Sequence, residues 1–186
     1  MMMDVIERVL VDEETLQARV QRLGAAISAD YESSNLILIC VLKGGVVFLT
    51  DLMRHITVPH EIDFLAISSY GAGQRESTGA VRLIMDLKAD IAGRDVLIIE
   101  DIVDSGQTME YLLRTLGARQ PASLRICTLL SKPTRRVVDV PVDYIGFEIP
   151  NEFVLGYGLD LDEKYRNLPY VAVLKQEYFG GLAGHF

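Results

Sequence analysis

Residues 96–108 read Val96-Leu97-Ile98-Ile99-Glu100-Asp101-Ile102-Val103-Asp104-Ser105-Gly106-Gln107-Thr108. The apolar start of this stretch predicts a buried strand, and the small polar residues predict a turn that leads into a helix. A strand end that feeds a helix N-terminus is where open α/β sheets bind ligands, and the free N–H groups there suit a phosphate. The adjacent carboxylates suit sugar hydroxyls or a magnesium ion. The stretch therefore predicts a ligand that carries phosphate, ribose and metal together.

Two plainer interpretations of this stretch stay open. Glu100 and Asp101 can be solvated charges at an exposed strand end, and Asp104 or Ser105 can simply cap the helix. The serine also presents a hydroxyl, and Gly106 lacks the Cβ that would keep a phosphate away from the backbone. The combination favours a phosphate site.

The composition is that of a globular protein of one domain. The chain has 186 residues, of which 49% are hydrophobic and 24% charged, which allows a sizeable core. Its formal net charge of −8 argues against a general binder of nucleic acid or of anionic membranes, because such a protein would carry a basic face. Local clusters of positive charge that could serve a phosphorylated substrate lie at Lys132, Arg135, Arg136, Lys164 and Arg166.

No segment of the sequence predicts export or membrane insertion. Residues 1–7 lack the charged and then apolar pattern of a signal peptide, and the longest strongly apolar run, 36–42, is far shorter than a membrane span. Cys40 and Cys127 lie in apolar runs, which is typical of reduced cysteines in a core. We expect a cytoplasmic protein without a membrane partner.

Strands and helices are expected to alternate over most of the chain. Asp12 is the predicted N-cap of the first helix, and the glycine-rich residues 70–79 predict a loop. Strands are predicted at 35–42, 60–69, 80–87, 95–103 and 123–130, and helices at 13–29, 46–56 and 106–116. The alternation implies an α/β fold with a mainly parallel twisted sheet flanked by helices, which the strand at 80–87 joins in the antiparallel direction.

The pattern changes after Lys132 and Pro133. Short strand-like runs, including 144–147 and 170–174, then alternate with turns and predict a small β-rich hood. We expect one domain over residues 1–186, with a core at 12–132 and a C-terminal hood at 133–186.

Residues 96–108 resemble the motif that binds phosphoribosyl pyrophosphate (PRPP) in type I phosphoribosyltransferases: an apolar run, two acids, two apolar residues, then Asp-Ser/Thr-Gly-x-Thr. Further motifs narrow the resemblance to the hypoxanthine (6-oxopurine) phosphoribosyltransferases. The pyrophosphate loop, the mobile catalytic loop and the purine-binding lysine segment of that family are similar to Val41-Leu42-Lys43-Gly44-Gly45, Ser68-Ser69-Tyr70 and Leu130-Ser131-Lys132. The purine-binding hood is similar to residues 146–160 and continues through 165–169.

The resemblance implies a role for each matching residue on the PRPP side of the site. The 5′-phosphate is held by Asp104, Ser105, Gly106, Gln107 and Thr108. Ribose and magnesium are held by Glu100 and Asp101, and a second magnesium by Asp160. Pyrophosphate is contacted by Lys43, Gly44 and Arg166. Without the resemblance, alternatives stay open: the residues at 43 and 44 can be a helix-start turn, Asp160 a turn cap and Arg166 a surface residue.

On the base side, the resemblance places Lys132 at the purine O6, Phe153 against the purine ring and Val154 at the base edge. A solvated loop lysine and a core aromatic are the plainer alternatives. Ser69 and Tyr70 belong to the mobile loop by resemblance. Some members of the family carry Lys where this chain has Glu152.

The implied reaction is the magnesium-dependent transfer of phosphoribosyl from PRPP to N9 of hypoxanthine or guanine, which yields IMP or GMP and pyrophosphate. Asp104 is the expected catalytic base, at the purine N7. The family also implies a homodimer or homotetramer. An enzyme of the superfamily that uses adenine or a pyrimidine remains an alternative, as does a regulator that binds nucleic acid, although the net charge of −8 argues against the regulator.

Overall fold

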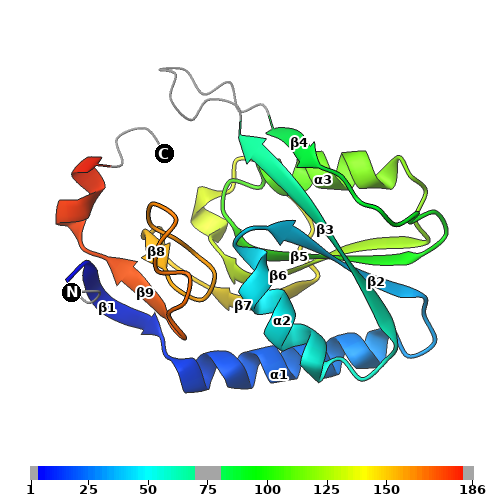
Figure 1. Ribbon diagram of the computed structural model, residues 1–186, viewed down its shortest axis with the longest axis horizontal. Helices are drawn as coiled ribbons and strands as arrows, with labels where there is room; N and C mark the ends of the chain where they lie inside the picture. Colours follow the sequence, from blue (N-terminus) through cyan, green and yellow to red (C-terminus); the bar gives the residue numbers. More distant parts are fainter. Residues whose placement is uncertain (1–3, 70–80, 182–186) are drawn as a thin grey trace.

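A six-stranded sheet lies at the centre of the computed structural model, which describes residues 4–69 and 81–181 (Figure 1). Its strands lie in the order β4-β3-β2-β5-β6-β7, and all neighbours are parallel except β3 and β4. A smaller antiparallel sheet has the order β1-β9-β8. The expected α/β fold is confirmed. The elements are β1 (Ile6–Val11), α1 (Glu13–Asp30), β2 (Leu36–Leu42), α2 (Gly45–His55), β3 (His60–Ser69), β4 (Val81–Met85), β5 (Asp95–Val103), α3 (Gln107–Gly117), β6 (Ser123–Ser131), β7 (Tyr144–Glu148), β8 (Val154–Leu155) and β9 (Val171–Leu174), with short 3-10 helices at Pro133–Arg135 and Gln176–Gly181.

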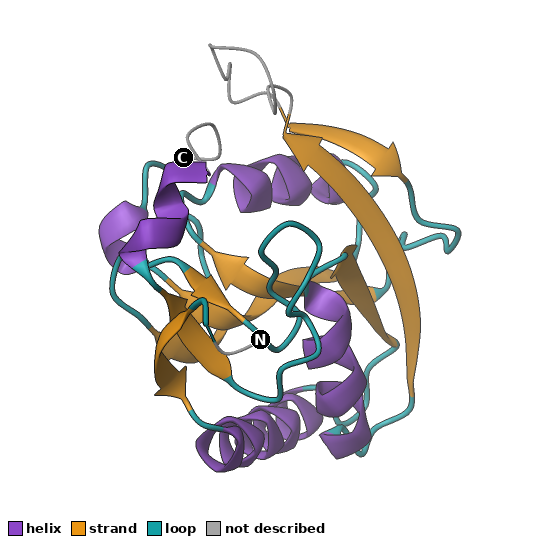
Figure 2. Cartoon of the chain, turned by 60° about the vertical axis from the view of Figure 1, so that its left-hand side comes forward, coloured by secondary structure: helices purple, strands orange, loops and turns teal. Residues whose placement is uncertain are grey.

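Strand β2 shows how the layers are held together. Its side chains point alternately to the two faces of the sheet. Leu38 and Cys40 join the hydrophobic cluster under α1 and α2, whereas Ile37 and Ile39 join the cluster under α3. Helices therefore cover both faces (Figure 2). A strand that is buried on both faces reads as a continuous apolar run, as this one does.

The start of α1 confirms the predicted N-cap. Asp12 accepts a hydrogen bond from the backbone N–H of Thr15 at 2.8 Å and another from the Thr15 hydroxyl at 2.9 Å. This contact satisfies one of the N–H groups that a helix leaves free in its first turn. The helix then runs along the sheet with Leu16, Val20 and Ile27 buried against the core.

Two strands lie where the sequence did not predict them. The strand expected in the hood at 144–147 instead pairs in parallel with β6 and forms an edge of the large sheet. Strand β1 was not predicted, and it pairs with β9 so that Ile6 lies opposite Leu174. The small sheet is thus built from both ends of the chain, and residue 133 does not mark a boundary between the two sheets.

The remaining expectations concern the loop, the cysteines and the membrane. Strand β4 pairs antiparallel with β3, as predicted, whereas the loop expected at 70–79 lies outside the described residues. Cys40 and Cys127 are buried and unpaired. Within residues 4–69 and 81–181, no helix is long and apolar enough to cross a membrane.

Candidate active site

The carboxyl ends of the parallel strands meet at one edge of the large sheet, and the predicted site residues follow them. Strand β2 ends just before Lys43, β5 just before Asp104 and β6 just before Lys132. The order of the strands reverses between β2 and β5, and open α/β sheets bind ligands at such a switch point. Two cavities lie at this edge.

The smaller cavity, of about 300 Å³, collects most of the residues that were expected to bind PRPP. Its lining includes Lys43, Gly44, Glu100, Asp101, Asp104, Ser105, Gly106, Thr108, Asp160 and Arg166. Gln107 is the first residue of α3 and is exposed. Ser69 is the last residue of β3, and Tyr70 lies outside the described residues.

The turn after β5 presents the N-terminus of α3 to the smaller cavity. The N-cap residue is Gly106, rather than Asp104 or Ser105, and it has a φ of 88° and no side chain to cap the helix. Ser105 Oγ lies 3.5 Å from the Gln107 nitrogen, a length at which little hydrogen bonding remains. A Cβ on the glycine would overlap the carbonyl oxygen of Val138. The glycine therefore allows the tight turn, and the N–H groups behind it suit a phosphate.

Glu100 and Asp101 form an acidic pair at the end of β5. Glu100 is only 7% exposed, and its Oε1 accepts a hydrogen bond from the Asp101 N–H at 3.2 Å. Burial, together with the charge of the neighbouring aspartate, raises the pKa of Glu100 well above its ordinary value. Burial also raises the pKa of Asp101. These acids are thus not solvated charges, and a bound cation would favour their ionised forms.

Asp101 also packs against Gly44 at the end of β2. A Cβ at position 44 would overlap the carboxylate of Asp101. A second glycine contact follows, because a Cβ on Gly158 would overlap the carbonyl oxygen of Gly44. The peptide bond between Leu42 and Lys43 is cis. The close packing explains why the segment after β2 requires a glycine at position 44.

The cationic residues of the smaller cavity pair with acids of the loop that follows β8. Arg166 Nη2 lies 2.8 Å from Asp160 Oδ1 and 3.1 Å from Glu163 Oε2. Lys43 Nζ lies 3.1 Å from the same oxygen of Glu163. Hydrogen bonds from Arg166 and then from Lys43 lower the pKa of Glu163. One carboxylate therefore joins the two cations that were expected to contact pyrophosphate.

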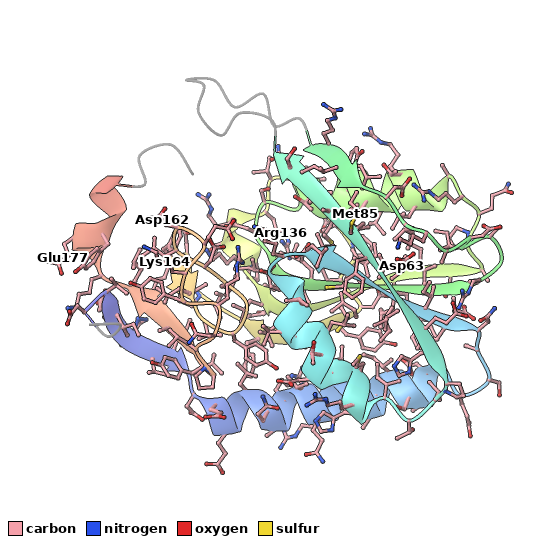
Figure 3. The ribbon with its side chains drawn as sticks, viewed as in Figure 1. Asp63, Met85, Arg136, Asp162, Lys164 and Glu177 are labelled. Atoms are coloured by element: carbon pink, nitrogen blue, oxygen red, sulfur yellow. The ribbon has the colours of Figure 1, made fainter. Side chains whose placement is uncertain are left out.

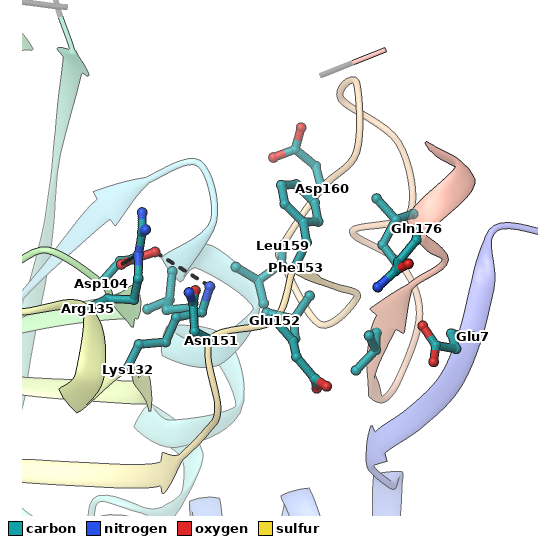
Figure 4. A pocket seen from close by; sticks show the side chains of 14 residues that line it. Glu7, Asp104, Lys132, Arg135, Asn151, Glu152, Phe153, Leu159, Asp160 and Gln176 are labelled. Carbon is teal, nitrogen blue, oxygen red and sulfur yellow. Dashed lines mark hydrogen bonds and ion pairs between the residues drawn. The ribbon is translucent and has the colours of Figure 1, made fainter. Parts of the chain in front are cut away.

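The larger cavity, of about 550 Å³, collects the residues that were expected to bind a purine (Figure 4). Lys132, Phe153 and Val154 all line it. The lysine is 7% exposed, so it is not a solvated loop residue, and its Nζ lies 3.5 Å from Asp104 Oδ2. Arg135 Nε lies 3.2 Å from the other oxygen of the aspartate. Both carboxylate oxygens of Asp104 therefore face a cation.

Asp104 lies where the two cavities meet. Only three residues among the described lining residues are common to both cavities, and they are Ile102, Asp104 and Asp160. Arg136, labelled in Figure 3, fixes the backbone there, because its Nη1 donates to the carbonyl oxygen of Asp104 at 2.7 Å and its Nη2 to the Ser131 hydroxyl at 3.0 Å. The carboxylate is thus held between the expected sugar and base sites.

The acids of the smaller cavity fit magnesium rather than a metal in an all-protein cage. In the described part of the chain, no three His, Cys, Asp or Glu side chains form a cluster ready to hold a metal ion. Magnesium keeps several waters and is usually bound by one or two carboxylates together with substrate phosphates. Glu100, Asp101 and Asp160 line a cavity whose size admits such a phosphate.

Several residues of the site were not predicted from the sequence. Glu163 belongs to none of the motifs, and it reaches the site because its loop folds onto Lys43. Glu7 of β1 and Gln176 also line the larger cavity, and Figure 4 shows both on the β1 side of the hood. For Glu7, the sequence offers one signal, the partly apolar run at 5–11. This run is too polar at its centre to be predicted as a strand.

The fold and the two adjoining cavities define a phosphoribosyltransferase, and comparison with known proteins agrees. The chain belongs to the phosphoribosyl transferase domain family, whose model matches residues 10–162. Within that family it groups with the hypoxanthine-guanine phosphoribosyltransferases. The protein of that name from Mycobacterium avium is 51% identical over 175 residues, which cover 91% of this chain and 86% of the relative.

Further relatives support this placement. The hypoxanthine-guanine phosphoribosyltransferase of Streptococcus thermophilus is 46% identical over 94% of this chain and 96% of its own length. Among solved structures, a hypoxanthine phosphoribosyltransferase from Staphylococcus aureus superimposes with a TM-score of 0.91 at 45% identity, and 96% of each chain is covered.

Proposed function

We propose that this enzyme of purine salvage joins hypoxanthine or guanine, through N9, to C1′ of PRPP and releases pyrophosphate, so that the products are IMP or GMP. The observation that carries this proposal is the position of Asp104, at the junction of the smaller and the larger cavity. PRPP would occupy the smaller cavity and the base the larger one. The two reacting atoms, C1′ and N9, would then meet beside the aspartate.

Asp104 has the chemistry of a general base at this junction. As pyrophosphate leaves, positive charge grows on C1′, and after attack by N9 it passes to the purine and acidifies N7–H. The Asp104 carboxylate can accept that proton because the acid strengthens during the step. Ser105, Gly106, Gln107 and Thr108 would meanwhile hold the 5′-phosphate at the N-terminus of α3.

Lys132 would select the base. Its buried ammonium donates to the O6 of hypoxanthine or guanine, whereas the amino group of adenine presents a second donor and leaves both donors unpaired. Sites built to recognise one hydrogen-bonding group reject the wrong partner by about 10⁴-fold or more. Phe153 would stack on the purine, and the backbone at Val154 would read the base edge.

Magnesium is the expected cofactor, and Glu100, Asp101 and Asp160 are the residues that would hold it. When bound, the ion would neutralise charge on the pyrophosphate leaving group. Lys43, the Gly44 backbone and Arg166 would contact the same pyrophosphate, and the forked guanidinium suits that task. Ser69 and Tyr70 correspond, by resemblance alone, to the catalytic loop of the family.

Steady-state kinetics with a panel of bases tests the proposal. We expect turnover of hypoxanthine and guanine with PRPP and magnesium, and none above background with adenine, uracil or orotate. Xanthine belongs in the same panel because its acceptance decides how strictly the 2-position is read. Turnover of adenine or a pyrimidine in preference to both 6-oxopurines would refute the assignment of the base, and nucleic-acid binding without any turnover would refute the enzyme itself.

We also propose a cytoplasmic location and a homo-oligomeric state for the enzyme. Two buried, unpaired cysteines fit a reducing compartment, which supports a cytoplasmic location. The family resemblance supports a homodimer or homotetramer. Apolar side chains at Ile84 and Met85 of the edge strand β4 are 67% and 40% exposed, which is in keeping with contact between copies. Light scattering coupled to gel filtration measures the oligomeric state directly.

A further inference from the structure

An ion pair connects the N-terminal strand to the larger cavity. Arg8 of β1 places Nη2 2.6 Å from Glu152 Oε2. The two side chains are 44% and 33% exposed. Glu152 lines the larger cavity directly before Phe153, the residue that would stack on the purine. A residue outside every motif of the family is thus attached to the wall of the proposed base site.

The segment that carries Phe153 has a second attachment, through its backbone. The carbonyl oxygen of Phe153 accepts a hydrogen bond from the Leu174 N–H of β9 at 2.9 Å. Strand β9 is the central strand of the small sheet and separates β8 from β1. The phenylalanine is therefore tied to β9 by its backbone, while the preceding glutamate ties the same segment to β1 by its side chain.

Strand β1 is attached to β9, with shifts in register between Ile6 and Arg8 and between Val9 and Val11. It pairs with β9 from Ile6 to Val11, and the Val5 carbonyl oxygen accepts from Lys175 N–H at 2.9 Å. Val5 is 7% exposed and belongs to the hydrophobic cluster against which Phe153 packs. The backbone that carries Arg8 is therefore held by β9, and its guanidinium reaches the carboxylate of Glu152 from this strand.

We infer that the Arg8–Glu152 ion pair is a positioning device through which β1 sets Phe153 against the purine. This inference rests on the proposed function. Arg8 and Glu152 are positioning residues for the base and not for PRPP, because the ion pair touches the wall of the larger cavity and neither residue lines the smaller one in the described chain. Loss of the pair therefore loosens the stacking segment and weakens base binding selectively.

Charge reversal gives the sharpest test. The variants are R8E, E152R and the double variant R8E/E152R, each assayed for the KM of hypoxanthine, the KM of PRPP and kcat. We expect each single variant to raise the KM of hypoxanthine by about two- to fivefold, the range that corresponds to an exposed ion pair, with the KM of PRPP unchanged. The double variant restores the pair in reverse and should return the KM of hypoxanthine toward that of the unmodified chain.

A matched control removes a similar ion pair far from the site. Arg119 Nη2 lies 2.8 Å from Asp86 Oδ1, with 30% and 51% of the two side chains exposed, and neither residue lines either cavity. The variant R119E should leave both KM values unchanged. Thermal unfolding of every variant reports any general loss of stability, which would move both KM values and kcat together.

The inference is overturned if R8E and E152R leave the KM of hypoxanthine unchanged, if they raise the KM of PRPP equally, or if the double variant shows no recovery. The unmodified chain, measured in the same series, separates this failure from that of the proposed function. If it turns over no 6-oxopurine, both fail; if it is active while the variants behave like R119E, the positioning role alone fails.

Discussion

Asp104 is held in place by three cationic side chains. Its oxygens lie 3.5 Å from Lys132 Nζ and 3.2 Å from Arg135 Nε, and its carbonyl oxygen accepts from Arg136. For D104N we expect kcat with hypoxanthine to fall by about 10²- to 10⁴-fold, the usual contribution of a general base. The amide has the same shape but accepts no proton. Single-turnover kinetics with saturating PRPP measure this step.

The control for this prediction is the affinity for PRPP. The backbone N–H groups at the start of α3 are unchanged in D104N, so isothermal titration should give a similar Kd for PRPP with magnesium. An undiminished kcat would show that the proton goes elsewhere. A large loss of PRPP affinity would instead assign Asp104 to phosphate binding.

Glu100 should make the enzyme less stable at high pH. Its pKa is raised in the folded chain by burial and by Asp101, so the folded state holds the proton more tightly than the unfolded state does. That contribution to stability is fully present below the unfolded pKa and is lost as the pH rises through the folded pKa. E100Q removes the dependence, so we expect its Tm to exceed that of the unmodified chain by a few degrees at neutral pH.

Thermal unfolding without magnesium, followed across the range from about pH 5 to pH 8, checks the sign. The difference in Tm between E100Q and the unmodified chain should widen as the pH rises. E177Q, which alters an exposed acid, should show no such trend. A gap that narrows with pH would mean that Glu100 is stabilised in its charged form.

The sequence predicted those site residues that belong to short motifs. Most of the expected residues from Lys43 to Arg166 line one of the two cavities. It did not predict Glu163, or the pairing of Arg8 with Glu152, because these contacts join segments that only the folded chain brings together. A charged residue in a loop is usually solvated, and no local pattern distinguishes the exceptions.

The loop after β8 contains Glu163, an acid whose two ion pairs can be removed by substitution. Glu163 pairs with Lys43 and Arg166, each at 3.1 Å, and the hydrogen bonds that lower its pKa keep it ionised. The pyrophosphate of PRPP would have to displace this carboxylate. For E163Q we therefore expect the KM of PRPP to fall by about two- to fivefold, the scale of an exposed ion pair. Steady-state kinetics at varied PRPP measure it.

D162N is the matched control for E163Q, because Asp162 is the exposed neighbouring acid on the same loop. Its KM for PRPP should not change. If both variants lower the KM equally, the effect comes from general loss of negative charge. If E163Q raises the KM, Glu163 orients the two cations instead of competing for them.

Strands buried on both faces could be predicted, whereas two strands at sheet edges, β1 and β7, were missed or misplaced. Strand β2 is a continuous apolar run, as is β5 from Val96 to Ile99, because helices cover both sides of the sheet. Strand β1 is mostly exposed between Ile6 and Leu10, so its apolar residues form no clear run. Strand β7 was assigned to the hood because the local pattern of a short strand does not show with which strand it pairs.

The protein as a whole is acidic, whereas its proposed substrate PRPP is a polyanion. The net charge is −8, and the smaller cavity itself contains Glu100, Asp101, Asp104 and Asp160 against the cations Lys43 and Arg166. PRPP alone would therefore meet more negative than positive charge. A divalent cation that binds between the acids and the phosphates removes this repulsion. Binding of PRPP should consequently depend on magnesium even before any reaction takes place.

Thermal unfolding with ligand tests this dependence. A ligand present at about 100 times its Kd stabilises the folded state by about 2.7 kcal/mol, which corresponds to a rise in Tm of about 5–10 °C for a chain of this size. We expect that rise with PRPP and magnesium, and most of it to vanish when EDTA replaces the metal. D101N should also reduce it, because one of the proposed metal ligands is lost, whereas R119E should keep it. An equal rise with and without EDTA would place the phosphates on the cations and the α3 N-terminus alone, with no role for the acidic pair in substrate binding.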